Sequence, residues 1–360
     1  MKMTDPCGPQ VGYQRIVCCF LEQLTRDHNS RSATVRGYID SINTLFELRN
    51  FPIPGDFRDN ENICVKYHNT LEKEEIVAKQ RSPITKEMFA ELVSKGKIAN
   101  AHSAVAVLYD WFCIIRICGF RCAEYAQTKQ TSIDTHQYPS GNKVVKAFTA
   151  QDWKFYDKQN SVIDCQNWSQ TCAIPYKLKL TFRIQKNRQN GQSITIVADE
   201  AHPDICPVRA AYRIFIRAKI LGQLDTEPLG VFINHQGVKR YLTSSKIADM
   251  LRDIAKTTHP DLTADEISRF SSHSGRVWAL VLLDEAGMSP SFMKARLRWL
   301  GDSYRLYLRD TSIIQEKHML ALNKSSEDIT KIVGENCMTL PTLVPIDDEM
   351  GNYDADPMND

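Results

Sequence analysis

The feature that most limits what this chain can fold into is the segment of residues 271–309, where groups suited to binding an anion recur around two expected helices. His273 and Arg276 stand three residues apart, directly before an apolar run with helical spacing. Gly287 then ends the first helix, and Pro290 suits the first turn of the second. The pattern predicts two consecutive helices, the first of which begins at the histidine and the arginine.

The start of that first helix suits a phosphate. Free N–H groups and the positive end of the helix dipole favour an anion at such a position. The spacing lets His273 and Arg276 face one bound group, because a guanidinium can hold two oxygens and an imidazole can move a proton at neutral pH. Taken alone, a histidine three residues before an arginine is mostly a chance surface pair, so its meaning depends on the residues at fixed distances after it.

Trp299 and Tyr307 come later in the segment, eight residues apart, and Tyr307 opens a Tyr-Leu-Arg triplet. An indole only donates hydrogen bonds, so Trp299 could hold a phosphate oxygen without titrating. A phenol has a pKa near ~10 in water, so Tyr307 could act as a nucleophile only beside arginines and a base. The alternatives are a core tryptophan and a packed helix tyrosine. Tyr304 is a rival nucleophile one helical turn earlier.

A second pair of charged residues stands upstream, where Gly119 closes an apolar helical run. Arg121 follows this glycine, so it is well placed at an element end to reach a phosphate. Glu124 returns to the same face three residues later if a helix begins there. Taken alone, such a pair is most often a surface salt bridge.

Residues 176–185 form the clearest expected strand, because apolar and polar side chains alternate along them. One face is therefore buried, and the other is basic and solvated. Asn190 and Gly191 supply a turn, and residues 193–197 return as the partner strand. The pattern predicts a β-hairpin within a mainly helical chain.

Lys186 lies at the tip of this hairpin. Counting the alternation onward from Leu178 puts Lys186 on the buried face, where an unpaired charge is costly. Donating a proton to a leaving hydroxyl would be a reason for a lysine there. The alternative is that the strand has ended and Lys186 is solvated, and Arg188 is then the next candidate for the role.

The length of 360 residues suits two domains, and the apolar share of 42% is that of an ordinary soluble globular protein. We expect a helical domain over residues 1–82 and a second domain over residues 83–323. Residues 324–360 are polar and acidic with little periodicity, so we expect a mostly disordered tail there.

Charge is unevenly spread along the chain. Residues 324–360 hold two lysines and nine acidic residues, a net charge of −7, so the whole-chain value of +2 leaves +9 on the rest. A basic body suits a polyanion as partner. The alternative is a solvated surface that carries a disordered tail.

Other features argue against membrane and metal sites. No cleavable signal is visible at the start, and the longest apolar stretch, residues 104–120, is interrupted by Asp110 and Arg116. The eleven cysteines are scattered without a C-x-x-C pair, and no histidines stand at ligand spacing near them. We therefore expect an intracellular protein with reduced thiols and no metal.

Four boxes of this sequence, in their order, resemble the catalytic motifs of the tyrosine recombinases, or phage-type integrases. Residues 118–124 resemble the first box, Thr-Gly-hydrophobic-Arg-x-x-Glu, with Cys118 in place of the threonine. The family carries its catalytic lysine on a β-hairpin, which favours Lys186. The later boxes resemble residues 273–276 and 299–309, and their Trp-to-Tyr spacing is most similar to recombinases of eukaryotic mobile elements.

The resemblance covers nearly everything except the acidic tail. It implies a mainly α fold with a small antiparallel β-sheet, in which a helical core-binding domain and an α+β catalytic domain close as a clamp on double-stranded DNA. It implies no cofactor, and a homotetramer on two DNA sites during synapsis. The active-site residues that it implies are Arg121, Lys186, His273, Arg276, Trp299 and Tyr307. It also implies that Glu124 supports these residues without contacting the phosphate itself.

Three other interpretations stay open at this point. A type IB topoisomerase shares this chemistry but relaxes supercoils as a monomer. A decayed or domesticated copy of a mobile element would bind DNA without cutting it. An ordinary helical scaffold could carry the boxes by coincidence. The compartment follows only from the substrate, as the nucleus in a eukaryote and otherwise the nucleoid or cytoplasm.

Overall fold

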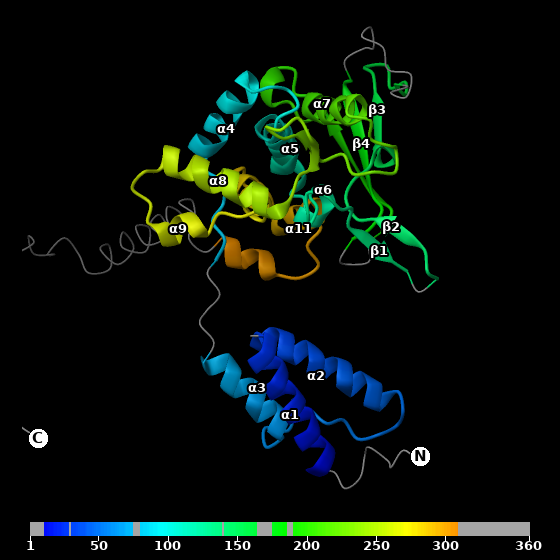
Figure 1. The fold of residues 1–360 in the computed structure, drawn as a ribbon, viewed down its shortest axis with the longest axis vertical. Coiled ribbons are helices and arrows are strands. Elements are labelled where there is room, and N and C mark those ends of the chain that lie inside the picture. The colour runs from blue at the N-terminus through cyan, green and yellow to red at the C-terminus, as the bar shows by residue number, and fades with distance from the viewer. Residues whose placement is uncertain are drawn as a thin grey trace, which may run out of the picture. The chain divides into compact units, whose positions relative to one another are not determined.

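The computed structural model describes residues 11–28, 30–74, 80–138, 140–163, 175–185 and 190–308. The chain divides into two compact units, residues 1–79 and residues 80–360, and Figure 1 shows the elements of each. The division lies three residues before the boundary that we expect at residue 82. The expected acidic tail, residues 324–360, lies outside the described residues.

The first unit contains α1 (Val11–His28), α2 (Ser32–Glu47) and α3 (Ile63–Glu74). Its small core joins all three helices, because Leu21, Val35, Ile39 and Cys64 are buried against one another. The loop between α2 and α3 is held by Asn43, whose side chain donates to the carbonyl of Gly55 at 2.8 Å and accepts from its N–H at 3.1 Å. The described part of the first unit is therefore helical, as expected.

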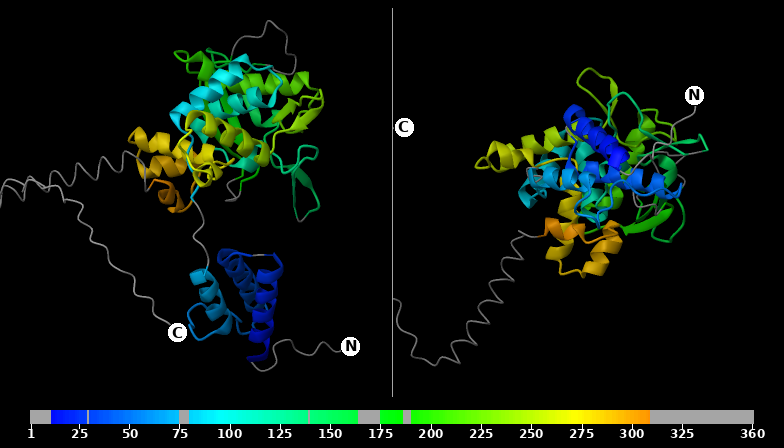
Figure 2. Two further views of the ribbon diagram at one scale, coloured as in Figure 1. Left: turned by 60° about the vertical axis from the view of Figure 1, so that its left-hand side comes forward. Right: turned by 90° about the horizontal axis from the view of Figure 1, so that it is seen from below.

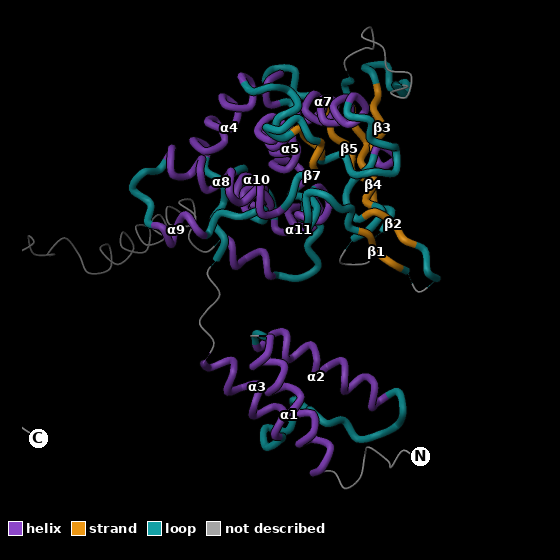
Figure 3. The backbone as a smooth tube through the Cα atoms, viewed as in Figure 1, coloured by secondary structure: helices purple, strands orange, loops and turns teal. Residues whose placement is uncertain are grey.

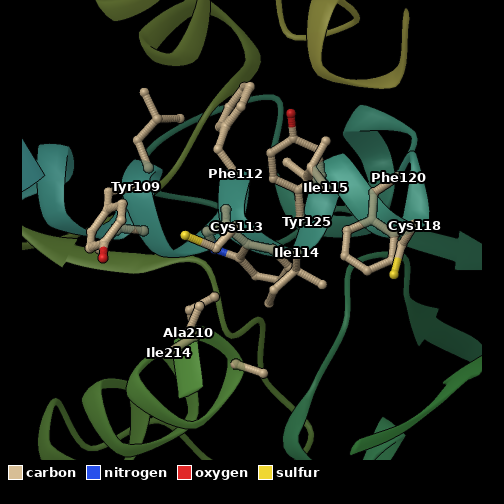
Figure 4. Close-up of a cluster of buried hydrophobic side chains, with 14 of the residues drawn as sticks. Tyr109, Phe112, Cys113, Ile114, Ile115, Cys118, Phe120, Tyr125, Ala210 and Ile214 are labelled. Carbon is tan, nitrogen blue, oxygen red and sulfur yellow. The ribbon is translucent and has the colours of Figure 1, made fainter. Parts of the chain in front are cut away.

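The second unit is built around α5 (Ala104–Cys118), on which α4 (Lys86–Ile98), α7 (Pro207–Ile220) and α10 (Ser274–Glu285) pack. Ser103 caps the start of α5, and Gly119 ends it in the left-handed conformation with φ of 54°. Figure 4 shows the apolar side chains of α5 from Tyr109 to Cys118, with Ala210 and Ile214 of α7 beside them. Such burial on most sides explains why this helix is apolar nearly throughout.

An antiparallel sheet of the order β3-β4-β5 adjoins α7. Its strands are β3 (Trp153–Tyr156), β4 (Lys177–Phe182) and β5 (Gln192–Val197). The alternation predicted for β4 is confirmed, because Leu178, Leu180 and Phe182 are buried while Lys179 is exposed. The hairpin to β5 is confirmed as well, with Leu180 opposite Ile194.

Apart from α8 (Ser244–Thr258), the remaining elements are short. The hairpin of β1 (Thr135–Gln137) and β2 (Lys143–Val145) projects from the body of the second unit (Figures 1 and 2). The others are α6 (Cys122–Tyr125), β6 (Val231–Ile233), β7 (Lys239–Tyr241), α8 (Ser244–Thr258), α9 (Ala264–Ser268), α11 (Pro290–Leu297) and three 3₁₀ turns, η1 (Ala150–Asp152), η2 (Pro203–Ile205) and η3 (Ser303–Tyr307). Figure 3 shows helices as the main component, so the predicted class, mainly α with small antiparallel sheets, is confirmed.

One local expectation is wrong, and it removes the argument for another. We expected Arg183 on the solvated face, but β4 has ended at Phe182, and the Arg183 guanidinium binds the buried carboxylate of Asp152. Because the strand ends there, the alternation cannot be counted on to Lys186, and the argument that placed Lys186 on the buried face fails. Lys186 and Arg188 lie outside the described residues, so the role given to Lys186 stays a prediction.

No helix among the described residues is long and apolar enough to cross a membrane.

Candidate active site

The ends of two helices bring Arg121 and Arg276 into one place. Arg121 is the N-cap residue of α6, directly after the turn at Gly119. Arg276 lies in the first turn of α10, and its side chain is 2% exposed. Its Nη1 donates to the carbonyl of Gly119, and its Nη2 donates to the carbonyl of Leu297 at 2.6 Å. Arg276 thus ties the start of α10 to the turn that presents Arg121.

The close approach of α10 to α5 depends on Gly275. A Cβ at this position would lie 2.7 Å from Cγ2 of Ile115, closer than real Cβ atoms come, and 3.0 Å from Cε1 of Phe112, which is tighter than most real Cβ contacts. The glycine in the His-Ser-Gly-Arg segment therefore has a packing role. It lets the neighbouring arginine reach across to the end of α5.

Three aromatic rings, those of His273, Trp299 and Tyr307, lie close to one another beside Arg276. The Arg276 guanidinium lies 4.6 Å from the ring centre of Trp299. The ring of Tyr307 lies 5.6 Å from that of His273 and 6.0 Å from that of Trp299, measured between centroids. The predicted histidine, second arginine, tryptophan and tyrosine are thus neighbours in space.

The two candidate tyrosines have different surroundings. Tyr304 is 2% exposed and belongs to the small core beneath α10 and α11. Tyr307 is only half-buried, and it lines a cavity of about 470 Å³ together with Arg81 and Arg269. A nucleophile must be reachable by its substrate, so the accessibility of the two residues favours Tyr307.

Two polar atoms of the site are buried without a hydrogen-bond partner among the described residues: Nε2 of His273 and Nε1 of Trp299. Most buried polar groups in folded proteins have a partner, so such atoms call for an explanation. A bound oxygen-rich ligand would supply one, because the indole donates and a neutral imidazole nitrogen can accept a proton.

The electrostatics of the site favour an anion. Burial, followed by the charges of Arg276, Arg81 and Arg121, lowers the pKa of His273 from 6.5 to about 4, so its imidazole is neutral at physiological pH. Burial and the charges of Arg121 and Arg298 lower the pKa of Arg276 to about 9, which leaves it charged. The clustered guanidinium groups repel one another, and a phosphate would relieve that repulsion.

The shift of His273 predicts a pH dependence of stability. The unfolded chain binds a proton at His273 near pH 6.5, whereas the folded chain resists it down to about pH 4. The free energy of unfolding should therefore fall as the pH drops through this window, by up to about 3 kcal/mol from this group. Urea unfolding of the full chain at several pH values measures it, and His273→Gln should flatten the curve. His235→Gln, at an exposed turn, is the control, and an unchanged curve in His273→Gln would contradict the prediction.

Glu124 lies beside two arginines, Arg121 of the first box and Arg298 after α11. Its Oε2 accepts from the backbone N–H of Arg121 at 2.9 Å, and its Oε1 lies 3.5 Å from Nη1 of Arg121. The carboxylate is buried, and Nη2 of Arg298 also donates to Oε2 at 2.8 Å. This arrangement agrees in geometry with a supporting position for Glu124 behind Arg121.

The structure therefore brings six of the seven predicted site residues together, and the seventh, Lys186, lies outside the described residues. The residue that sequence reasoning missed is Arg298. It is 3% exposed, although its neighbours in sequence gave no periodic signal that it would be buried. Its adjacency to Trp299 was the only cue available. No group of metal-binding side chains occurs in the part of the chain that the structure describes.

Comparison with known proteins gives structural matches only. No family model matches the sequence, and no curated protein is significantly similar to it. Several solved structures of recombinases and integrases match. One of them is the XerA recombinase, with 11% identity and a TM-score of 0.37. The match covers 85% of this chain and 81% of the XerA chain.

Two further matches are structures of DNA complexes. The Tn1549 transposon integrase with circular-intermediate DNA has 12% identity and a TM-score of 0.43, and the match covers 89% of this chain and 87% of that one. The XerH site-specific recombinase bound to its difH substrate has 9% identity and a TM-score of 0.38. The match covers 86% of this chain and 78% of the XerH chain.

Proposed function

We propose that this chain is a site-specific DNA recombinase or integrase that cuts and rejoins duplex DNA through a 3′-phosphotyrosine. The observation that carries the proposal is the gathering of five groups of four chemical kinds from separate segments of the chain. A reachable phenol, a neutral imidazole and an indole N–H without a partner lie beside two guanidinium groups. Each of these groups has a distinct use in phosphodiester transfer, and a scaffold has no need of the combination.

In the proposed reaction, the phenol oxygen of Tyr307 attacks the scissile phosphorus, and the bond from phosphorus to the 5′ oxygen breaks. The phenol proton passes to Nε2 of His273, which is neutral and can accept it. Lys186, by resemblance to the family, gives a proton to the leaving 5′ oxygen. The phosphotyrosine keeps the energy of the broken bond, so that attack by a 5′ hydroxyl reverses the step without a nucleotide.

Arg121, Arg276 and Trp299 would stabilise the negative charge that develops on the non-bridging oxygens. Arg276 uses one N–H from each of two nitrogens for the carbonyls of Gly119 and Leu297. A guanidinium carries five N–H groups, so three remain for a phosphate. The two carbonyls hold the group in place before the substrate arrives, which lowers the cost of reorganisation during the reaction.

The substrate class that this chemistry requires is double-stranded DNA. Contacts from lysine and arginine to the backbone should supply much of the affinity, which would therefore fall steeply with salt. In this proposal residues 1–82 are the core-binding domain, residues 83–323 form the catalytic domain, and a homotetramer assembles on two DNA sites.

A type IB topoisomerase is the nearest alternative function, because it would use the same groups. It would relax supercoiled plasmid as a monomer without preference for a sequence. A recombinase would instead select a site and join two duplexes. Plasmid relaxation and the sequence preference of the cleaved DNA therefore distinguish the two.

The test is to trap the covalent intermediate in EDTA. Because the target is unknown, the full chain is incubated with a pool of nicked duplexes whose central segment is randomised, and adducts are recovered under denaturing conditions. We expect adducts without added metal, on a selected sequence, joined through a tyrosine that peptide mass spectrometry identifies. Formation of adducts only with Mg²⁺, or none from any pool, would argue against the proposal.

A further inference from the structure

Arg298 occupies an unusual position for an arginine. It follows α11 in the left-handed conformation, with φ of 58° and ψ of 48°, and its side chain is 3% exposed. A left-handed conformation is unfavourable for a residue with a Cβ, and burial of a charge adds a further cost. Two unfavourable features at one residue are retained only where its contacts compensate for them.

The contacts of Arg298 join distant parts of the site. Its Nη2 donates to Oε2 of Glu124 at 2.8 Å, and its guanidinium carbon lies 3.7 Å from the ring centre of Phe182, the last residue of β4. Its own backbone carbonyl accepts a hydrogen bond from Nη2 of Arg121 at 3.0 Å. One residue thus contacts both members of the first box and the end of the strand that precedes Lys186.

Glu124 has one negative charge and two arginines beside it. Its contact with the Arg298 guanidinium is short, at 2.8 Å, whereas its contact with the Arg121 guanidinium is at 3.5 Å, the outer limit for a hydrogen bond. Arg298 is therefore the closer charged partner of the carboxylate. The Arg121 guanidinium makes only the longer contact, and its side chain is 24% exposed.

We propose that Arg298 is a positioning residue that holds the carboxylate of Glu124 away from the guanidinium of Arg121, so that Arg121 is available to a phosphate. Without Arg298, the carboxylate would turn to Arg121 and form a two-pronged ion pair with it. That internal pair would compete with the substrate for the same N–H groups. This inference rests on the proposed function, since it assigns Arg121 to a phosphate.

The first experiment measures the binding of inorganic phosphate to the full chain by calorimetry, with Arg121→Met to identify the signal of this site. Arg298→Met should weaken phosphate binding about tenfold, which corresponds to about 1.4 kcal/mol. The double variant Glu124→Gln/Arg298→Met removes both charges, so Arg121 is released and binding should return to within about threefold of the wild type. Arg298→Lys keeps the charge and should retain most of the affinity.

A purely structural role for Arg298 predicts a different pattern. The double variant would then bind phosphate as weakly as Arg298→Met, because both lack the same side chain, and that result would overturn the proposal. Equal affinity in Arg298→Met and the wild type would overturn it too. If Arg298→Met does not fold, the phosphate affinity of the double variant, which leaves no unpaired buried charge, is the test. Affinity near that of the wild type supports the proposal, and weak binding overturns it.

The second experiment separates this inference from the proposed function. On the DNA selected in the trapping experiment, the scissile phosphate is replaced by a neutral methylphosphonate, which needs less positive charge from Arg121. The cleavage defect of Arg298→Met should be at least about tenfold smaller on this substrate. A wild-type chain that forms no adduct would refute the recombinase, whereas an active wild type whose Arg298→Met variant is equally impaired on both substrates would refute only the role of Arg298.

Discussion

Tyr307→Phe is expected to abolish the covalent DNA adduct, lowering its rate of formation by at least about 10⁴-fold. The change removes only the hydroxyl that would attack the phosphorus. The ring remains, and with it the packing against His273 and Trp299. Folding should therefore be nearly unaffected, with a free energy of unfolding within about 1 kcal/mol of the wild type. Denaturing gel electrophoresis with end-labelled DNA measures the adduct.

Tyr304→Phe is the matched control for this experiment. Tyr304 lies three residues earlier in the same 3₁₀ turn, but its side chain is buried in a small core. Its variant should keep the adduct at a rate similar to that of the wild type. An adduct that survives Tyr307→Phe and is lost in Tyr304→Phe would transfer the nucleophilic role to Tyr304. If the adduct forms in both variants, neither Tyr304 nor Tyr307 is the nucleophile.

Asp110→Asn is expected to cause the largest loss of stability, about 3–5 kcal/mol. Asp110 lies in the middle of α5 and is 1% exposed. Its carboxylate accepts from Nε of Arg213 at 2.6 Å and from Nη2 of Arg217, both of which lie on α7. The neutral amide would leave two guanidinium groups without a counter-charge at the contact between the two central helices.

Asp253→Asn is the control for that prediction. Asp253 lies on α8, where it forms an exposed ion pair of 3.2 Å with Lys256, and such surface pairs contribute about 0–1 kcal/mol. Urea unfolding of the full chain, followed by a signal from the second unit, measures both variants. A loss in Asp110→Asn no larger than that in Asp253→Asn would show that the buried cluster does not hold α5 against α7.

Local patterns in the sequence predicted much of the fold. The run of apolar residues and the glycine that closes it, Gly119, indicated α5, and strict alternation indicated β4 with its buried and exposed faces. These signals are local, because a helix or a strand repeats its environment every few residues. The candidate site residues could be chosen in the same way, since each box is a short pattern.

The same reasoning failed where the chain left regular structure. Arg183 follows the last residue of β4, and its partner Asp152 stands 31 positions earlier, which no alternation can indicate. Tyr304 and Tyr307 lie in one 3₁₀ turn, yet Tyr304 is buried and Tyr307 is half-buried, a difference that the spacing of the two residues does not indicate. Turns and strand ends depend on contacts that the local pattern does not contain.

The sequence by itself determined the residue types of the site and their order, because the periodic segments and short boxes are written in neighbouring positions. Only the tertiary structure decided how these groups meet. Arg298 and Glu124 are 174 positions apart, and Arg276 reaches the carbonyl of a residue 157 positions before it. The physical reason is that a buried charge is stable only beside a partner, and the fold selects that partner by bringing distant helix ends together. The neutral state of His273 arises in the same way, from burial among arginines that three separate segments supply.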